Sequence, residues 1–228
     1  LAHIVKDGLR RMYGENSENI YYYLTVYNEP YVQPAEPDNL DLQGLLRGMY
    51  LYAPAKKQRK KNAQILASGV AVNWALKAQK ILAEDWGVAA SVWSVTSWNE
   101  LRRDGLAVDR HNMLNPQDKK LAFVTSKLKG TEGPVVAVSD FMRAVQDQIA
   151  TWVPNAFHSL GTDGFGLSDT RGALRRHFKV DAESIVVATL SELAKAGEIK
   201  GKAVLEAINK YRIFDIHAAD AGNTEGSG

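Results

Sequence analysis

The chain has 228 residues, of which 45% are hydrophobic and 24% charged, and it contains no cysteine. This length suits one large domain, or one domain with part of another. The lack of cysteine excludes disulfides, thiol nucleophiles and thiolate metal sites. A formal net charge of +2 gives no general attraction to nucleic acid or anionic membranes. No apolar run approaches the roughly 20 residues that span a bilayer, so we expect a cytoplasmic protein that binds neither nucleic acid nor membrane.

The N-terminal part predicts one helix and one strand. Residues 1–13 carry apolar side chains at helical spacing, and the chain opens inside this helix without a methionine, so we expect a piece of a longer protein. Asn19–Tyr27 is rich in aromatic and β-branched residues, which is typical of a strand. The proline-punctuated stretch that follows, up to Pro37, is excluded from the interior of a sheet.

From Ala63 onward, short apolar runs alternate with amphipathic segments. The predicted strands are Ala63–Ala67, Val88–Val95, Val135–Val138 and Ala156–Leu160. The predicted helices are Leu42–Met49, Val70–Trp86, Leu121–Lys129, Phe141–Val153, one starting near Arg171, Ala182–Ala196 and Gly201–Arg212. Strands that alternate with helices indicate βαβ units and a largely parallel sheet covered by helices. The basic run Lys56–Lys61 lacks interleaved aromatic residues and predicts a solvated loop.

Gly161–Asp169 (GTDGFGLSD), which we call the glycine loop, is the most unusual stretch. Three glycines in six positions predict a tight loop against which another surface packs closely. Ser168 or Asp169 is expected to cap the helix that starts near Arg171. The glycine spacing fits neither of the common phosphate-binding patterns, GxGxxG or GxxxxGK[ST].

We therefore favour a packing or subunit contact for this loop, with Phe165 inserted into a neighbouring surface. A direct ligand contact, for which Asp163 and Ser168 are the polar candidates, remains the alternative, followed by catalysis. His158 precedes the loop on a predicted strand and is the histidine to test as an acid or base, although a structural role is favoured. The histidines of the chain show no metal-ligand spacing.

Two further places are candidates for a binding cleft. Asn28 and Glu29 lie at the predicted strand end with Tyr31 close behind, where they can line a cleft or simply stiffen a linker. Gly69 precedes the amino end of the predicted helix Val70–Trp86. Helix amino ends attract anions, so an anion site is a candidate there, although most strand-to-helix turns bind nothing. The residues alone thus predict an α/β domain without a complete catalytic set.

Two long stretches resemble one enzyme family. Asn19–Pro37 (NIYYYLTVYNEPYVQPAEP) and Gly161–Ile199 (GTDGFGLSDTRGALRRHFKVDAESIVVATLSELAKAGEI) are similar to the C-terminal part of the homodimeric, bacterial-type pyruvate dehydrogenase first component. The supporting segments between them are Ser91–Leu101, Arg110–Pro116 and Val138–Met142. The resemblance extends from Leu1 to about Ile213. The Tyr21–Tyr23 run and the glycine loop argue against transketolase itself or 2-oxoglutarate dehydrogenase.

This resemblance implies a fold and domain boundaries. The expected fold is a three-layer, five-stranded mixed sheet like that of the transketolase C-terminal domain, mostly parallel with one antiparallel edge strand. It would follow the last helix and strand of a pyrimidine-binding domain. We expect residues 1–37 to be the end of that domain, 38–62 a linker, 63–213 the C-terminal domain and 214–228 a disordered tail.

The resemblance also implies a function for the parent protein. That family decarboxylates pyruvate with thiamine diphosphate and magnesium, works as a homodimer, and passes the acetyl group to a dihydrolipoyl acetyltransferase core. Its Gly-Asp-Gly metal-diphosphate motif is absent from this sequence, as are the positions of its activating glutamate and active-site histidines. We therefore expect no catalytic, cofactor-binding or metal-binding residue here, no activity of the segment alone, and a role in dimerisation and active-site access. The alternative is a non-catalytic docking module for the acetyltransferase core.

Overall fold

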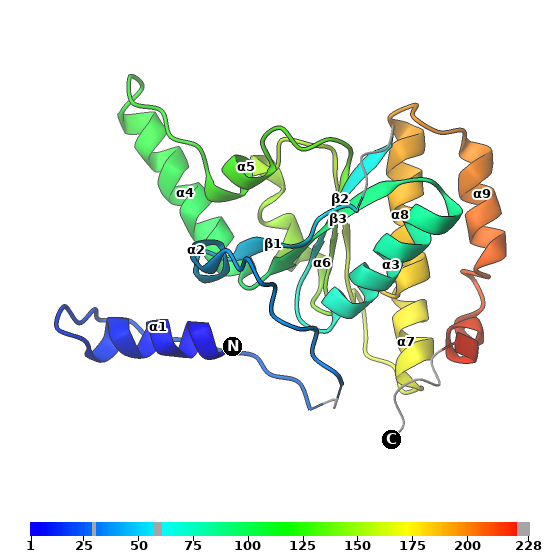
Figure 1. The fold of residues 1–228 in the computed structure, drawn as a ribbon, viewed down its shortest axis with the longest axis horizontal. Coiled ribbons are helices and arrows are strands. Elements are labelled where there is room, and N and C mark those ends of the chain that lie inside the picture. The colour runs from blue at the N-terminus through cyan, green and yellow to red at the C-terminus, as the bar shows by residue number, and fades with distance from the viewer. Residues whose placement is uncertain (29–30, 57–60, 223–228) are drawn as a thin grey trace.

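A central sheet with helices on both faces organises the chain in a computed structural model, which describes residues 1–28, 31–56 and 61–222 (Figure 1). The strands are β1 (Met49–Ala53), β2 (Asn62–Ala67), β3 (Ala89–Val95), β4 (Val135–Val138) and β5 (Phe157–Leu160). They form a five-stranded sheet in the order β1-β3-β2-β4-β5. β2, β3, β4 and β5 are parallel, and β1 pairs antiparallel with β3 at one edge. The predicted mixed sheet with one antiparallel edge strand is confirmed.

The described helices lie on both faces of this sheet, except α1, which projects away from it (Figure 1). They are α1 (Ala2–Tyr13), α2 (Leu42–Leu46), α3 (Ala71–Asp85), α4 (Trp98–Leu114), α5 (Phe123–Leu128), α6 (Arg143–Asp147), α7 (Arg171–His177), α8 (Ala182–Lys195) and α9 (Gly201–Lys210), with 3-10 helices η1 (Ala150–Trp152) and η2 (Ile216–Gly222). α3 and α8 lie against one face of the sheet, and α9 packs on α8 (Figure 1).

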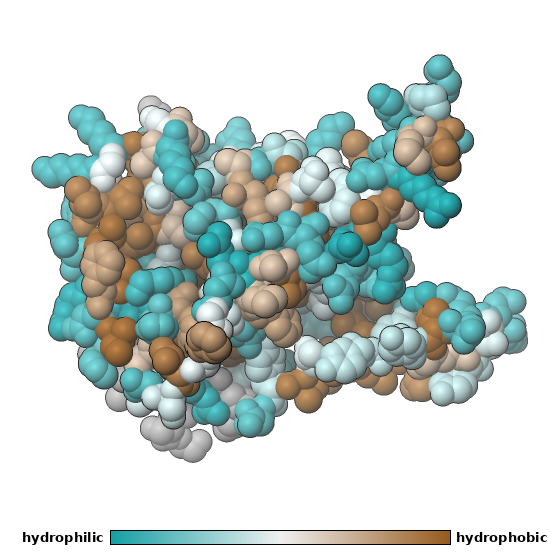
Figure 2. All heavy atoms as spheres, turned by 180° about the vertical axis from the view of Figure 1, so that it is seen from behind, coloured by the Kyte–Doolittle hydropathy of each residue, from teal (hydrophilic) through white to brown (hydrophobic). Residues whose placement is uncertain are grey.

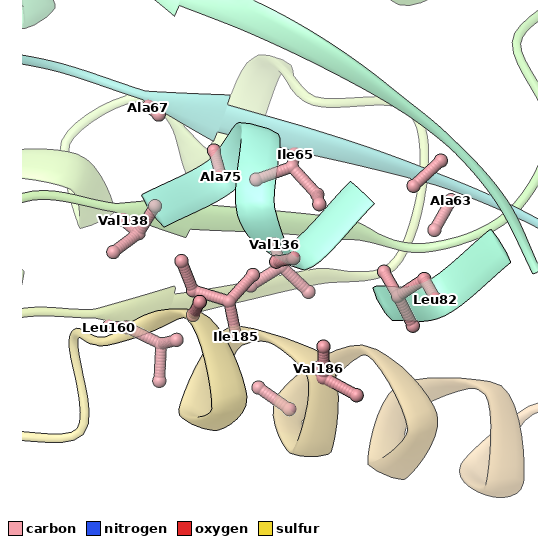
Figure 3. Packing of buried hydrophobic residues seen from close by; sticks show 14 of the residues in the cluster. Ala63, Ile65, Ala67, Ala75, Leu82, Val136, Val138, Leu160, Ile185 and Val186 are labelled. Carbon is pink, nitrogen blue, oxygen red and sulfur yellow. The ribbon is translucent and has the colours of Figure 1, made fainter. Parts of the chain in front are cut away.

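The face under α3 and α8 holds the larger apolar core. Strand side chains alternate between faces, so Ile65 points into this core together with Val136, and both are fully buried. Figure 3 shows Ala75 of α3 and Ile185 of α8 directed toward the same strand residues. The alanines of α3 let the helix approach the sheet closely. Burial of each large aliphatic side chain stabilises the fold by about 1.5–3 kcal/mol.

The opposite face is covered by α4, α5 and the segment around η1. Leu66, Trp93 and Val135 of the strands pack there against Leu101 and Ile149. β2 is therefore buried on both faces, which explains why apolar residues occupy the successive positions Ile65–Ala67 instead of alternating with polar ones.

α4 is a long helix that the hydrophobic spacing did not predict. Ser97 caps it by accepting a hydrogen bond from the Glu100 backbone N–H at 3.1 Å. Gly105 lies flat against the Trp152 ring, and an added Cβ would come within 2.5 Å of it. Only Trp98, Leu101 and Gly105 of the helix are buried, so its apolar stripe is too short for a clear period. The far end of α4 projects from the domain on the same side as α1 (Figure 1).

The predicted strand at Asn19–Tyr27 is wrong. Residues 19–37, which we call the strap, form neither helix nor strand wherever the structure describes them. Tyr21 is 87% exposed and Tyr23 is 85% exposed, so this aromatic run has no sheet face to cover. A strand also needs a neighbour for its backbone groups, and no described strand lies beside the strap.

Several boundaries also differ from expectation. The helix predicted at Leu42–Met49 ends at Leu46. Gly48, with φ +111°, follows it, and Met49 is the first residue of β1. Phe141–Val153 divides into α6 and η1. In the predicted disordered tail, η2 extends to Gly222, while residues 223–228 lie outside the described residues. Residues 57–60 of the basic run also lie outside them.

Candidate functional site at the carboxyl edge of the sheet

A crevice of about 750 Å³ opens at the carboxyl ends of β2 and β3, under the strap. In open α/β sheets this edge is the usual place for ligands, at the point where successive connections leave a strand toward opposite sides. β2 is such a point, because β3 pairs on one side of it and β4 on the other. Aromatic, hydroxyl and amide side chains dominate the lining, among them Tyr27, Tyr31, Tyr52, Ser68, Asn73 and Trp98.

The floor of the crevice is a buried hydrogen-bond network. The Ser68 hydroxyl donates to the Ser139 hydroxyl at 2.9 Å and accepts from the Trp98 indole N–H at 3.0 Å. The Phe141 backbone N–H donates to Ser139 Oγ at 3.1 Å. Neither serine has a base among these partners, so the network holds loops in place and activates no nucleophile.

Tyr27 reaches from the strap onto the amino end of α3. Its hydroxyl donates to Asp140 Oδ1 at 2.7 Å, and the Val70 backbone N–H donates to the phenol oxygen. Gly69, with φ +59°, provides the room, since a Cβ there would overlap the phenol oxygen. Burial, assisted by the Asp140 hydrogen bond, raises the pKa of Tyr27, so the phenol is neutral at physiological pH.

This arrangement explains why the amino end of α3 needs no anion. α3 has no side-chain cap of its own, and the Tyr27 phenol fills the position at which the sequence suggested a bound anion. The group at that position must accept from the Val70 N–H and donate to the Asp140 carboxylate. A neutral hydroxyl does both, whereas an anion would meet the like charge of Asp140.

The start of the glycine loop is packed tightly against the segment after β4. A Cβ on Gly161 would lie 2.5 Å from the Phe141 carbonyl oxygen. The Thr162 hydroxyl donates to the Asp140 carbonyl at 2.7 Å, and Asp163 Oδ1 accepts from the Arg143 backbone N–H at 2.9 Å. Asp163 therefore has a structural partner, and the predicted close packing holds at this end of the loop.

The tip of the loop is open. No atom would lie within 4 Å of a Cβ on Gly164 or Gly166, and Phe165 is 93% exposed. Among the described residues, then, Phe165 inserts into no surface, and the tip of the loop makes no close packing within the chain. Its insertion into a partner subunit stays a prediction.

The cap of α7 is Thr170 instead of Ser168 or Asp169. Thr170 Oγ1 accepts from the Ala173 backbone N–H at 3.2 Å, while Asp169 Oδ1 accepts from the Thr170 N–H at 2.7 Å. The helix begins at Arg171, which puts Thr170 at the N-cap position with extended backbone angles. Ser168 is exposed on the loop.

His158 lies away from the crevice, facing α8. Its Nδ1 is 3.4 Å from Glu192 Oε1, and Lys195 Nζ is 2.6 Å from the same carboxylate oxygen. Burial lowers the pKa of His158, against the smaller raising effect of Glu192. The histidine thus lies between β5 and α8 and faces Glu192, away from the crevice.

The strap residues singled out by the sequence separate in the structure. Tyr31 lines the crevice, and its hydroxyl accepts from Gln33 Nε2 at 3.3 Å. Asn28 is exposed and lies outside the lining, and Glu29 lies outside the described residues. Tyr27, Ser68 and Asp140 were missed as a group, because Tyr27 and Asp140 are 113 positions apart. The one local signal in the sequence was the pair Tyr27 and Tyr31, which flank Pro30.

The residues of the crevice do not fit a magnesium-bound diphosphate. No charged side chain lines it in the described part of the chain, whereas magnesium and phosphate groups are held by carboxylates, cationic side chains and free backbone N–H groups. Across the same residues, no group of three or more His, Asp or Glu side chains is arranged to hold a metal ion. None of the described helices combines the length and apolarity needed to cross a membrane.

The family model of the transketolase-like C-terminal domain matches residues 48–181. The chain is 57% identical over 220 residues to the pyruvate dehydrogenase E1 component of Mycolicibacterium smegmatis, covering 96% of the chain and 24% of that protein. The proteins of the same name from Mycobacterium tuberculosis and Escherichia coli K12 are 55% and 44% identical over 99% and 93% of the chain. The chain spans about a quarter of the length of these relatives, at 24% of each.

Among solved structures, transketolases show a weaker likeness. Transketolase from Pichia stipitis in complex with a sedoheptulose phosphate aligns with a TM-score of 0.48 and 20% identity, over 72% of this chain and 20% of that one. Transketolase from Leishmania mexicana aligns with a TM-score of 0.46 and 19% identity, over 69% of this chain and 20% of that one.

Proposed function

The chain belongs to the transketolase-like C-terminal-domain family, and on that basis we propose that it is the C-terminal segment of a pyruvate dehydrogenase decarboxylating component. The observation that carries the proposal is the 57% identity to a protein of that name over 96% of the chain. The parent enzyme would decarboxylate pyruvate with thiamine diphosphate and magnesium, and transfer the acetyl group to the lipoyl group of an acetyltransferase.

Within that parent we assign the segment a supporting role. Its crevice offers no charged side chain to a magnesium-bound diphosphate, so the cofactor would be held by other parts of the protein. Side chains of this chain would then support the dimer and shape access to the active site. The segment alone would be inactive, because electrostatic and cofactor-based catalysis need groups that it lacks.

Exposed apolar side chains of residues 1–13, which we call the N-terminal arm, and of the strap support this role. Leu1, Leu9 and Tyr13 of α1 are 67%, 53% and 79% exposed, and Val26 of the strap is 74% exposed. Figure 2 shows the apolar side chains of this arm, which projects from the domain. Contiguous exposed apolar surface usually marks contact with another chain or domain, which is the property expected of a piece that completes a larger assembly.

The test compares the 228-residue chain with the intact parent protein. Calorimetric titration with thiamine diphosphate and magnesium should give binding by the parent and none by the chain. Pyruvate turnover, followed by reduction of an artificial electron acceptor, should show the same contrast. Circular dichroism confirms that the chain is folded. Micromolar cofactor binding by the chain alone would contradict the supporting role, and a parent unable to turn over pyruvate would contradict the enzyme assignment.

One observation favours a docking role as the second candidate. Phe165 is 93% exposed and Leu167 is 53% exposed, on a loop tip whose glycines have open space around them. Such a tip suits insertion into a pocket of an acetyltransferase core. A titration of the acetyltransferase's peripheral subunit-binding domain into the chain, followed by NMR, should show saturable shifts that Phe165→Ala removes and Leu205→Ala on α9 does not. Absence of saturable shifts would eliminate docking through the loop.

A further inference from the structure

Two tyrosines in the first half of the strap, Tyr22 and Tyr27, each pack against a glycine. The Tyr22 ring lies against Gly8 of α1, where an added Cβ would be 3.2 Å from the ring. The Tyr27 phenol lies against Gly69 at the start of α3, where a Cβ would overlap it. Each tyrosine thus packs directly against a glycine: the contact is tight at Gly8 on the N-terminal arm, and at Gly69 on the domain only glycine leaves room for the phenol.

We propose that Tyr22 and Tyr27 form a two-point clamp that fixes α1 relative to the carboxyl edge of the sheet and forms one wall of the crevice. The clamp does not depend on the proposed function. It assigns Tyr27 as a positioning residue, with Gly69 and Asp140 as its socket.

The Tyr22 end of the clamp is held by charged partners. The Arg11 guanidinium donates to the Tyr22 oxygen at 3.0 Å, and the Tyr22 hydroxyl donates to Asp7 Oδ2 at 3.2 Å. Arg11 is itself paired with Glu18 at 2.6 Å. These contacts join the strap to α1 but reach no residue of the domain.

The Tyr27 end is the polar attachment of strap residues 21–28 to the domain. Their backbone makes no hydrogen bond to other described residues of the domain, and Val26 is 74% exposed. The strap position in this half therefore depends on the phenol, which donates to Asp140 at 2.7 Å and accepts from the Val70 N–H. Further along, the Tyr52 hydroxyl donates to the Ala35 carbonyl at 2.7 Å and holds the second half of the strap.

Asp140 extends the clamp to the glycine loop. Its side chain accepts from Tyr27, and its backbone carbonyl accepts from the Thr162 hydroxyl at 2.7 Å. Strap and glycine loop therefore share one anchor in the segment after β4. The socket chemistry selects a neutral hydroxyl, so phenylalanine at position 27 would fill the space without making either hydrogen bond.

The absence of cysteine makes the clamp directly measurable. Nitroxide labels on two introduced cysteines, at exposed Thr25 of the strap and exposed Lys80 of α3, report the strap-to-domain distance by pulsed electron paramagnetic resonance. A second pair, at exposed Lys6 of α1 and Thr25, reports the α1-to-strap distance. Both pairs should give a single narrow distance in the otherwise unchanged chain.

Each end of the clamp should break separately. Tyr27→Phe and Asp140→Ala should broaden the strap-to-domain distance and leave the α1-to-strap distance narrow. Tyr22→Phe should do the reverse. Asp140→Asn keeps an acceptor for the phenol and should retain the narrow strap-to-domain distance. If Tyr27→Phe leaves that distance narrow, or if both distances broaden in every variant, the clamp is wrong.

Gly69→Ala gives an independent test with a matched control. Its Cβ should expel the phenol and broaden the strap-to-domain distance. Gly130 also has a positive φ, at +81°, and a Cβ added there would have no atom within 4 Å, so Gly130→Ala adds backbone strain without a clash. Broadening in Gly69→Ala but not in Gly130→Ala supports the socket. Equal distributions in the two variants would overturn it, and thermal unfolding of both confirms that each is folded.

Discussion

The sheet and the strap are held in place by different physics. The sheet is fixed by burial: β2 is covered on both faces, and Ile65, Leu66 and Val136 have no exposed surface. The strap has an exposed backbone and aromatic side chains, and a few side-chain hydrogen bonds hold it across the carboxyl edge. The stabilisation of the sheet is distributed over many buried side chains, whereas the position of the strap depends on a few individual hydrogen bonds. Substitutions in the two regions should therefore differ in size and in what they change.

The largest contrast is expected between matched aliphatic truncations. Ile185 of α8 is fully buried, so Ile185→Ala should lower the free energy of unfolding by about 2–5 kcal/mol. Val26→Ala in the strap removes an exposed side chain and should change it by less than about 0.5 kcal/mol. Urea unfolding followed by circular dichroism measures both. A cost for Val26→Ala similar to that for Ile185→Ala would mean that the strap is part of the core.

The next largest effect is expected in the buried hydrogen-bond network at the floor of the crevice. Ser68→Ala removes the acceptor of the Trp98 indole N–H and the donor to Ser139. A buried donor left without a partner costs about 1–3 kcal/mol, and Trp98 is only 4% exposed. Urea unfolding should show this loss. Tyr22→Phe, at the end of the strap that contacts α1, is the control and should have little effect on unfolding of the domain; an equal loss would contradict the distinction.

A smaller effect separates the anchored and open parts of the glycine loop. Thr170→Ala removes the cap of α7 and should cost about 0.5–2 kcal/mol. Ser168→Ala should be neutral because Ser168 is exposed and Thr170 is the cap. Thermal unfolding of the two variants decides which residue begins the helix, and a greater cost for Ser168→Ala would restore the assignment made from the sequence.

The same contrast explains what the sequence can predict. β2, β3, β4 and the α3 helix were predicted closely because their apolar spacing reports burial directly, and Gly87 ends α3 with φ +66° as expected of a helix terminator. α4 was missed because most of it faces solvent, although Ser97 and Glu100 form a capping pattern that signals its start.

The strand predicted at Asn19–Tyr27 was wrong for a different reason. Its tyrosines and β-branched residues have strand propensity, but propensity is overridden when no neighbouring strand is present. Its attachment is a contact between Tyr27 and Asp140 across 113 positions, which no local pattern contains. For the same reason the crevice was not predicted: Tyr31 was identified as a cleft residue, but its partners in the lining come from β1 and from the loops after β2 and β3.

The smallest predicted effect is a pH dependence of the unfolding free energy, which arises from His158 in the sheet. Burial lowers the pKa of His158 in the folded chain, so the folded state binds fewer protons than the unfolded state between the two pKa values. Stability should therefore rise with pH across that window and be lost as the pH falls below about 6.5, the usual value for histidine. His158→Gln should flatten this part of the profile of unfolding free energy against pH. Because Tyr27 titrates far above this range, the strap-to-domain distance should stay constant over the same pH interval. A change in that distance would mean that the pH acts on the strap as well, and the separation between the two regions would fail.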